Sequence, residues 1–293
     1  MNGLQQLLTQ HALPHDYADF VSLYLEPVAA AIDGRIRLDG IPLIGINGSQ
    51  GSGKSTAALF LKLLLENEYG HRVVVLSIDD FYHGKATREA MAQSLHPLFA
   101  TRGVPGTHDI ELAINTIAAL RKAAAGECVE VPRFDKANDD RKPREQWDRV
   151  QGPVSAIILE GGCLGAPPLS DALLHEPVNE LERVEDRDGT WRMAYSNFLA
   201  EEYQQLFDDI DWLLMLKAPS FSVVYDWRLL QEQKLAQSTA HGGSLLNAQQ
   251  VGRFIAHYQR LTEHCLHRIP DVADAVIELD DRHRMTTLRM QRT

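Results

Sequence analysis

The chain has 293 residues, which is enough for one large α/β domain or two small ones with a sizeable core. The formal net charge is −11, so nucleic acid and anionic membranes are not expected partners. The three cysteines form no CxxC pair, which argues against a zinc site and a disulfide framework. The first residues lack the pattern of a secretory signal, and no apolar run reaches the ~18 residues of a membrane span. We therefore expect a cytoplasmic protein.

Helical and strand-like apolar patterns alternate along the chain. Helices are expected at 17–32, 56–65, 109–120, 220–235 and 248–267, and strands at 41–46, 72–78, 154–159, 212–216 and 273–279. Short runs that are apolar throughout, such as RVVVLSI at 72–78, are typical of strands buried on both faces of a parallel sheet. The alternation predicts an α/β fold in which helices cover both faces of such a sheet.

Two polar segments interrupt this alternation. One lies near 131–151 and contains RFDKANDDRKPREQ; the other lies near 167–193 and contains NELERVEDRDG. Both are predicted to be long surface insertions, which in compact domains are usually functional or mobile. No internal repeat marks a boundary, so we expect a single domain over residues 1–293.

The first predicted strand runs into a glycine-rich turn that matches the P-loop pattern GxxxxGK[ST] in full. A chance match is the alternative, but a strand before the turn and a helix after it are the context that the motif requires. The residues expected to bind ATP are Gly48, Ser49, Gln50, Gly51, Ser52, Gly53, Lys54, Ser55 and Thr56. Glycines let successive N–H groups face phosphate oxygens, and the helix N-terminus adds its positive end. Lys54 is expected to contact the β- and γ-phosphates, and the Ser55 hydroxyl to ligate Mg²⁺.

Acidic residues follow the next two strands. Asp79 and Asp80, with Tyr82, come directly after the second strand, where ligands bind in open α/β sheets. Asp79 is the candidate general base for an acceptor hydroxyl, and Asp80 and Tyr82 are candidate substrate-binding residues. Asp80 could instead approach Mg²⁺ through water or only cap the turn, and capping is also the alternative for Asp79. Glu160 ends the third strand and is a candidate for the metal shell, with simple exposure in a loop as the alternative.

Three further residues are candidates for the acceptor site. Asp109 could accept hydrogen bonds from substrate hydroxyls or serve as a helix N-cap. His108 is expected to be structural or to act through a neighbour. Arg133 could bind an acceptor carboxylate through bidentate hydrogen bonds from its guanidinium group, and Lys136 could add positive charge. For both residues the alternative is a solvated, charged loop.

The helix expected at 220–235 carries basic residues. Arg228 is a candidate catalytic residue, because a cation near the phosphates stabilises the charge of a phosphoryl-transfer transition state. Lys234 lies further along the same helix. A solvated helix face is the alternative for both residues.

The stretches GSQGSGKST and SIDDFYH are similar to the phosphoribulokinase, uridine kinase and pantothenate kinase group of P-loop kinases. Within that group the chain resembles the D-glycerate 3-kinase family, through RGVPGTHD, VPRFDKA, ILEGGCLG, PVNELERVEDRDGTWR and VYDWRLLQEQKL. The resemblance runs from about residue 41 to residue 235. It implies a P-loop NTPase fold with a five-stranded parallel sheet in the order 2-3-1-4-5 and a helical lid.

The same resemblance implies transfer of the γ-phosphate of ATP to the 3-hydroxyl of D-glycerate, with ATP and Mg²⁺ as cofactors. It gives Lys54 and Ser55 the phosphate and metal roles, Asp79 the role of base, and Arg228 the role of lid arginine. The alternatives are a kinase for another small hydroxyl compound, such as a nucleoside or a pantothenate-like acid, and a regulatory P-loop ATPase. The expected partner is a small-molecule substrate, and the chain is expected to be a monomer or a homodimer.

Overall fold

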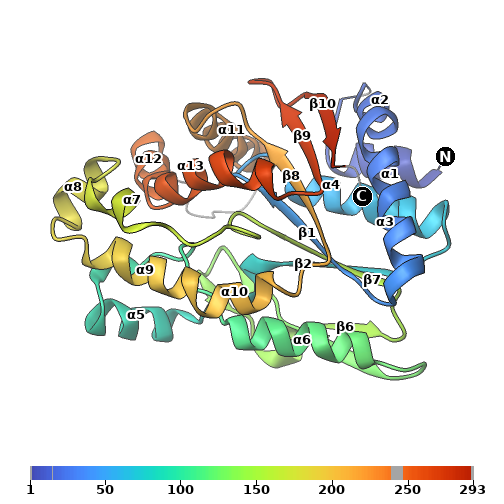
Figure 1. Cartoon of the computed structure of the whole chain (residues 1–293), viewed down its shortest axis with the longest axis horizontal. Helices are drawn as coiled ribbons and strands as arrows, with labels where there is room; N and C mark the ends of the chain where they lie inside the picture. Colours follow the sequence, from blue (N-terminus) through green and yellow to red (C-terminus); the bar gives the residue numbers. More distant parts are fainter. Residues whose placement is uncertain (1, 15, 239–246, 292–293) are drawn as a thin grey trace.

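A twisted, mostly parallel sheet forms the centre of the molecule, which a computed structural model describes for residues 2–14, 16–238 and 247–291 (Figure 1). Within these residues the main sheet has six strands in the order β10-β9-β8-β1-β7-β2. Their bounds are β1 Leu43–Gly48, β2 Val73–Ser77, β7 Ala156–Gly161, β8 Trp212–Lys217, β9 Ala275–Leu279 and β10 Met285–Met290. Five of them run parallel, and β10 pairs antiparallel with β9.

Helices pack on both faces of the sheet. The α-helices are α1 Asn2–Gln10, α2 Tyr17–Phe20, α3 Glu26–Asp39, α4 Lys54–Asn67, α5 Lys85–Ser94, α6 Ile110–Lys122, α7 Asp171–His175, α8 Glu180–Glu185, α9 Thr190–Ala200, α10 Glu202–Phe207, α11 Ser222–Ser238, α12 Ala248–Ala256 and α13 Gln259–Arg268. Helices α3, α4 and α11 share one apolar core, and helices α6, α9, α10 and α13 share the other. Among the described residues, none of the helices combines the length and the apolarity needed to cross a bilayer.

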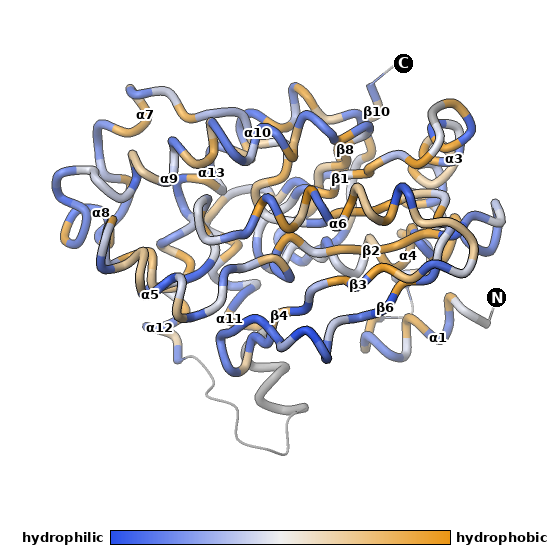
Figure 2. Tube along the Cα trace, turned by 90° about the horizontal axis from the view of Figure 1, so that it is seen from below, coloured by the Kyte–Doolittle hydropathy of each residue, from blue (hydrophilic) through white to orange (hydrophobic). Residues whose placement is uncertain are grey.

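Successive side chains along each strand point to opposite faces of the sheet, and so contribute to the two apolar cores in turn. In β1, Leu43 belongs to one core and Ile44 to the other, and both are fully buried. Ile157 and Ile158 divide in the same way in β7. Figure 2 shows the apolar colour concentrated along β1 and β2, whereas the α8 segment is hydrophilic. Burial on both faces explains why these strands read as continuous apolar runs.

The predicted α/β architecture is confirmed, and the sheet has one strand more than the five expected. Numbered along the chain, the parallel strands lie in the order 2-3-1-4-5, and β10 extends the sheet beyond the fifth. This sixth strand has the sequence MTTLRM, in which Met285 is buried and the next two residues are exposed. An edge strand of this kind lacks the continuous apolar run by which the others were found.

Two of the predicted helices differ from the structure by more than a few end residues. The helix expected at 17–32 continues to Asp39 and contains a π-helical turn, Val21–Leu25. The single helix expected at 248–267 is wrong: α12 ends at Ala256 and α13 begins at Gln259. The break falls at Tyr258, whose hydroxyl donates to the Arg102 carbonyl oxygen at 2.7 Å. A long-range contact of this kind leaves no periodic signal in the sequence.

The two polar segments also differ from simple surface loops. Residues 131–151 form short antiparallel ladders, built from β3 Cys128–Val131 with β6 Asp148–Gln151 and from β4 Phe134–Asp135 with β5 Asp140–Arg141. Residues 167–193 fold into α7, α8 and the start of α9. The prediction that this second segment lies on the surface is wrong for three of its charged residues, Glu182, Asp186 and Arg192, which are almost fully buried.

Candidate active site

The P-loop joins β1 to α4, and its backbone has a shape that requires glycine at several positions. Gly51 and Gly53 have positive φ angles of 75° and 88°, in the region that favours glycine. A Cβ on Gly48 would lie 2.6 Å from the Ser52 hydroxyl oxygen, so a side chain would not fit there. The Lys54 ammonium donates to the Ser49 carbonyl oxygen at 3.0 Å. The loop therefore has the turn, the helix N-terminus and the mobile cation of a phosphate site.

The two candidate metal ligands meet beside this loop. The Ser55 hydroxyl, in the first turn of α4, donates to the carboxylate of Glu160, near the end of β7, at 2.8 Å. Glu160 is only 7% exposed, which excludes the alternative of a freely solvated loop residue. One hydroxyl and one carboxylate fit Mg²⁺, which usually keeps several waters and takes its remaining ligands from substrate phosphates. No larger group of acidic, histidine or cysteine ligands occurs in the described part of the chain.

Asp79 lies in the 3₁₀ turn Ile78–Phe81 that follows β2, and it forms an ion pair with Lys136. The Lys136 ammonium is 2.7 Å from the Asp79 carboxylate, whose side chain is about one-third exposed. Burial tends to raise the pKa of Asp79, but the charge and hydrogen bond of Lys136 outweigh it and lower that pKa well below its ordinary value. Asp79 is therefore ionised and able to accept a hydrogen bond from an acceptor hydroxyl.

Asp80 points to a different set of partners. Its carboxylate accepts from the Arg133 guanidinium at 2.7 Å and from the Phe134 N–H at 3.1 Å. The same guanidinium contacts Asp148 at 2.8 Å. Burial raises the pKa of Asp80, and the charge of Arg133 opposes that effect. Arg133 thus ties the β4 segment to the turn after β2, and its binding of an acceptor carboxylate stays a prediction.

Asp109 acts as the N-cap of α6. One carboxylate oxygen accepts from the Leu112 N–H at 3.1 Å, and the other accepts from Arg141 at 3.1 Å. Arg141 also donates to the carbonyl oxygens of Phe81 and Tyr82. Of the two roles that the sequence left open for Asp109, the structure supplies the cap; a substrate contact stays a prediction.

A small, half-enclosed pocket lies between Asp79 and the P-loop. It holds about 330 Å³ of empty space, a figure that includes its open mouth. Its walls include Gln50, Asp79, Tyr82, His108, Cys163 and Tyr258. The candidate base and one P-loop residue therefore face the same cavity. Nothing in the sequence indicated Tyr258, because it is far from Asp79 along the chain and reaches the pocket only through the fold.

The helix that carries Arg228 packs against the phosphate turn. A Cβ on Gly51 would lie 3.0 Å from the Cβ of Trp227 and 3.7 Å from the Arg228 backbone nitrogen. The half-buried Arg228 guanidinium lies over the Phe254 ring, 5.5 Å from its centroid. This position beside the P-loop agrees with a lid arginine, whose catalytic contact stays a prediction. The side chain of Lys234 lies outside the described residues.

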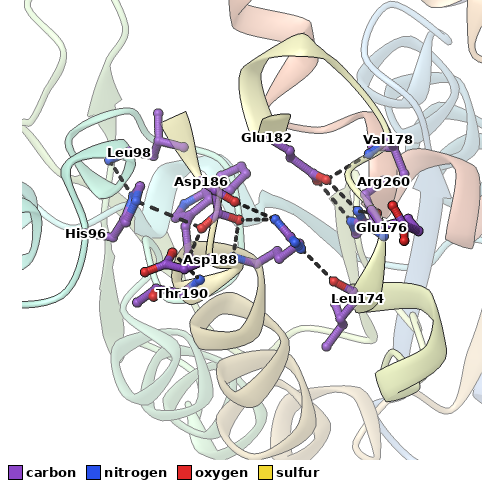
Figure 3. A network of polar contacts seen from close by, with 12 residues as sticks. His96, Leu98, Leu174, Glu176, Val178, Glu182, Asp186, Asp188, Thr190 and Arg260 are labelled. Atoms are coloured by element: carbon purple, nitrogen blue, oxygen red, sulfur yellow. Dashed lines mark hydrogen bonds and ion pairs between the residues drawn. The ribbon is translucent and has the colours of Figure 1, made fainter. Parts of the chain in front are cut away.

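Residues 167–193 take part in a buried network of charges (Figure 3). Arg260 of α13 pairs with Glu182 of α8, and Arg192 pairs with Asp186 at 2.9 Å. All four side chains are at most 6% exposed. Arg260 also donates to the carbonyl oxygens of Leu173 and Glu176, so its charge is fully surrounded by acceptors. Because α13 follows Tyr258 directly, the network fixes the helix that forms one wall of the pocket.

We expect Glu182→Gln to destabilise the protein by about 1–3 kcal/mol, because the amide leaves part of the buried Arg260 guanidinium without an acceptor. Urea unfolding followed by circular dichroism measures this loss. The matched control is Glu180→Gln, because Glu180 pairs with Arg183 on the exposed face of the same helix. That change should stay within about 0.5 kcal/mol. Equal, small effects of both variants would show that the buried pair does not stabilise the fold.

The fold and the site together define a P-loop kinase. No protein-family model matches the sequence. The chain is 31% identical over 275 residues to an uncharacterized kinase of Schizosaccharomyces pombe (mug58), covering 86% of this chain and 96% of that protein. It is 29% identical over 270 residues to the chloroplastic D-glycerate 3-kinase of Arabidopsis thaliana, covering 88% of this chain and 56% of that protein.

A solved structure gives the same relationship. The D-glycerate 3-kinase from Cryptococcus neoformans superposes with a TM-score of 0.76 at 25% identity, covering 91% of this chain and 98% of that one. The chain belongs to the D-glycerate 3-kinase family of P-loop kinases. It is an ATP-dependent phosphotransferase.

Proposed function

We propose that the protein is a D-glycerate 3-kinase, which transfers the γ-phosphate of ATP to the 3-hydroxyl of D-glycerate. The observation that carries the proposal is the small pocket that brings Asp79 and the P-loop residue Gln50 together. Lys136, which pairs with Asp79, supplies a cation at the same place for an acidic acceptor. Two relatives that are named D-glycerate 3-kinases support the same substrate.

Each group at the site then has one task. The P-loop amides and Lys54 bind the phosphates of ATP, and Ser55 and Glu160 would hold Mg²⁺, which neutralises phosphate charge when bound. Asp79 orients the acceptor hydroxyl and takes its proton as the oxygen bonds to the γ-phosphorus. The bond from that phosphorus to the bridging oxygen of ADP breaks in the same displacement. Arg228 is placed to stabilise the charge of the transferring group.

Release of ADP, measured by a coupled assay over a panel of acceptors, tests the proposal. We expect turnover with D-glycerate and little ATP hydrolysis without an acceptor, because closure around the acceptor assembles the site. Phosphorus NMR of the product should show 3-phosphoglycerate. Turnover only with uridine, or only with pantothenate, would replace the proposed substrate. Fast hydrolysis that no acceptor changes would indicate a regulatory ATPase instead.

We expect Lys136→Met to raise KM for D-glycerate about ten-fold or more, while KM for ATP stays within a few-fold. The acceptor carboxylate would lose its cation in a partly desolvated site, and a ten-fold change corresponds to about 1.4 kcal/mol. Steady-state kinetics with each substrate varied in turn measures both constants. Glycerol, which has no carboxylate, is the control acceptor, and its KM should not respond to the change. An unchanged KM for D-glycerate would move the carboxylate contact to another residue, with Arg133 next to be tested in the same way.

A further inference from the structure

His108 is buried in the wall of the acceptor pocket, in the loop that precedes α6. Its side chain is only 1% exposed, and it lines the pocket together with Asp79 and Tyr82. Its ring stacks on Tyr82 with 4.2 Å between centroids and 21° between planes. A backbone bridge joins the same two residues. The imidazole is therefore held in one place by the turn that also carries the candidate base.

The hydrogen bonds of Tyr203 define which ring nitrogen of His108 carries the proton. The Tyr203 hydroxyl oxygen accepts from the Gly106 N–H at 3.1 Å and lies 2.6 Å from His108 Nδ1. A proton on Nδ1 would make that oxygen accept twice and leave the hydroxyl proton without an acceptor among the described residues. The hydroxyl must then donate to Nδ1, which places the imidazole proton on Nε2.

Two facts describe this Nε2–H group. Burial lowers the pKa of His108 to about 3, so the ring is neutral and carries a single proton. Nε2 is buried and has no hydrogen-bond partner within the described part of the chain. A buried donor without a partner is costly, and in the wall of a ligand pocket a ligand oxygen is the acceptor that removes the cost.

We infer that the His108 Nε2–H donates a hydrogen bond to an oxygen of the bound acceptor, and that Tyr203 sets the tautomer that makes this possible. The inference rests on the proposed function in one respect, namely that this pocket holds a small hydroxy acid. Hydroxyl and carboxylate oxygens both accept from such a donor, whereas an apolar or cationic group does not. His108 is then a binding residue of the acceptor site, and Tyr203 is a positioning residue behind it.

Two substitutions of His108 separate the proposed contact from the rest of the side chain. The amide of His108→Gln places an N–H near the position of Nε2, whereas that of His108→Asn lies near Nδ1 and faces Tyr203. We expect His108→Asn to raise KM for D-glycerate about ten-fold with KM for ATP within two-fold. His108→Gln should stay within about three-fold of the parent. Equal kinetics for the parent and both variants would overturn the inference, provided that their thermal unfolding is unchanged.

Tyr203→Phe tests the positioning step, because it removes the hydroxyl and keeps the ring. It should raise KM for D-glycerate several-fold on its own and have no further effect in the His108→Asn background. Additive effects in the double variant would mean that Tyr203 does not act through His108.

Nitrogen-15 NMR of the histidine rings in the parent protein needs no substitution and no turnover. We expect the His108 signals of a neutral ring protonated on Nε2, with the Nε2 signal shifting when D-glycerate is added. A ring protonated on Nδ1 would overturn the inference even if the protein proves to be a D-glycerate kinase. An Nε2–H tautomer whose signal responds only to a different acceptor would instead overturn the proposed substrate and leave the contact standing.

Discussion

Asp79→Asn should lower kcat for phosphoryl transfer by about 10²–10⁴-fold, the usual cost of losing a general base. The amide keeps the shape of the carboxylate but cannot take a proton from the acceptor hydroxyl. Asp79 faces the acceptor pocket, and its Lys136 partner keeps it ionised. The Kd for ATP should change little, because the phosphates bind on the P-loop. Steady-state kinetics and calorimetric titration with ATP measure the two quantities.

Asp80→Asn is the matched control for this prediction. Asp80 is the next residue in the same turn, but its carboxylate is held by Arg133 and the Phe134 N–H. Its replacement should therefore have a smaller effect on kcat than that of Asp79. A collapse of ATP affinity in Asp79→Asn with a normal residual kcat would identify Asp79 as a metal or nucleotide ligand and exclude the role of base.

The phosphate turn and the strand ends could be predicted because their signals are local. Lys54 and Ser55 follow a strand within a single motif, and Asp79 and Glu160 directly end buried strands. The carboxyl ends of parallel strands meet at one edge of the sheet, so their convergence follows from the fold class alone. The contact between Ser55 and Glu160 at 2.8 Å is the result of that geometry.

The acceptor side of the site could not be predicted in the same way. Tyr258 reaches the pocket because α12 and α13 break around it and its hydroxyl bonds to the Arg102 carbonyl oxygen. The polar pattern of residues 167–193 predicts a solvent-exposed segment, whereas Glu182 is buried against Arg260 of a distant helix. Such pairs form between residues that are far apart in the sequence. The sequence around a charged residue therefore does not indicate whether a distant partner will be buried with it.

Lys54→Ala should lower the rate of phosphoryl transfer by at least a hundred-fold while the protein stays folded. Lys54 begins α4 and directs its ammonium to the Ser49 carbonyl oxygen within the P-loop. The apolar cores do not include it, so its loss leaves the packing of α4 intact. Removing one preorganised donor from a charge that develops in the transition state typically costs ~2.7–4 kcal/mol. Coupled assays measure the rate, and circular dichroism and thermal unfolding measure the fold.

Lys62→Ala provides the control for Lys54→Ala within the same helix. The Lys62 ammonium donates to the Val73 carbonyl oxygen at 2.8 Å, on the side of α4 that faces β2 and away from the phosphate turn. Its removal also deletes one lysine from α4, yet it should leave kcat and KM for ATP within a few-fold of the parent. If both variants lose activity equally, the loss comes from the helix and its general charge. If Lys54→Ala keeps near-normal activity, the P-loop lysine does not act on the transferring phosphate, and the phosphate role of this loop is wrong.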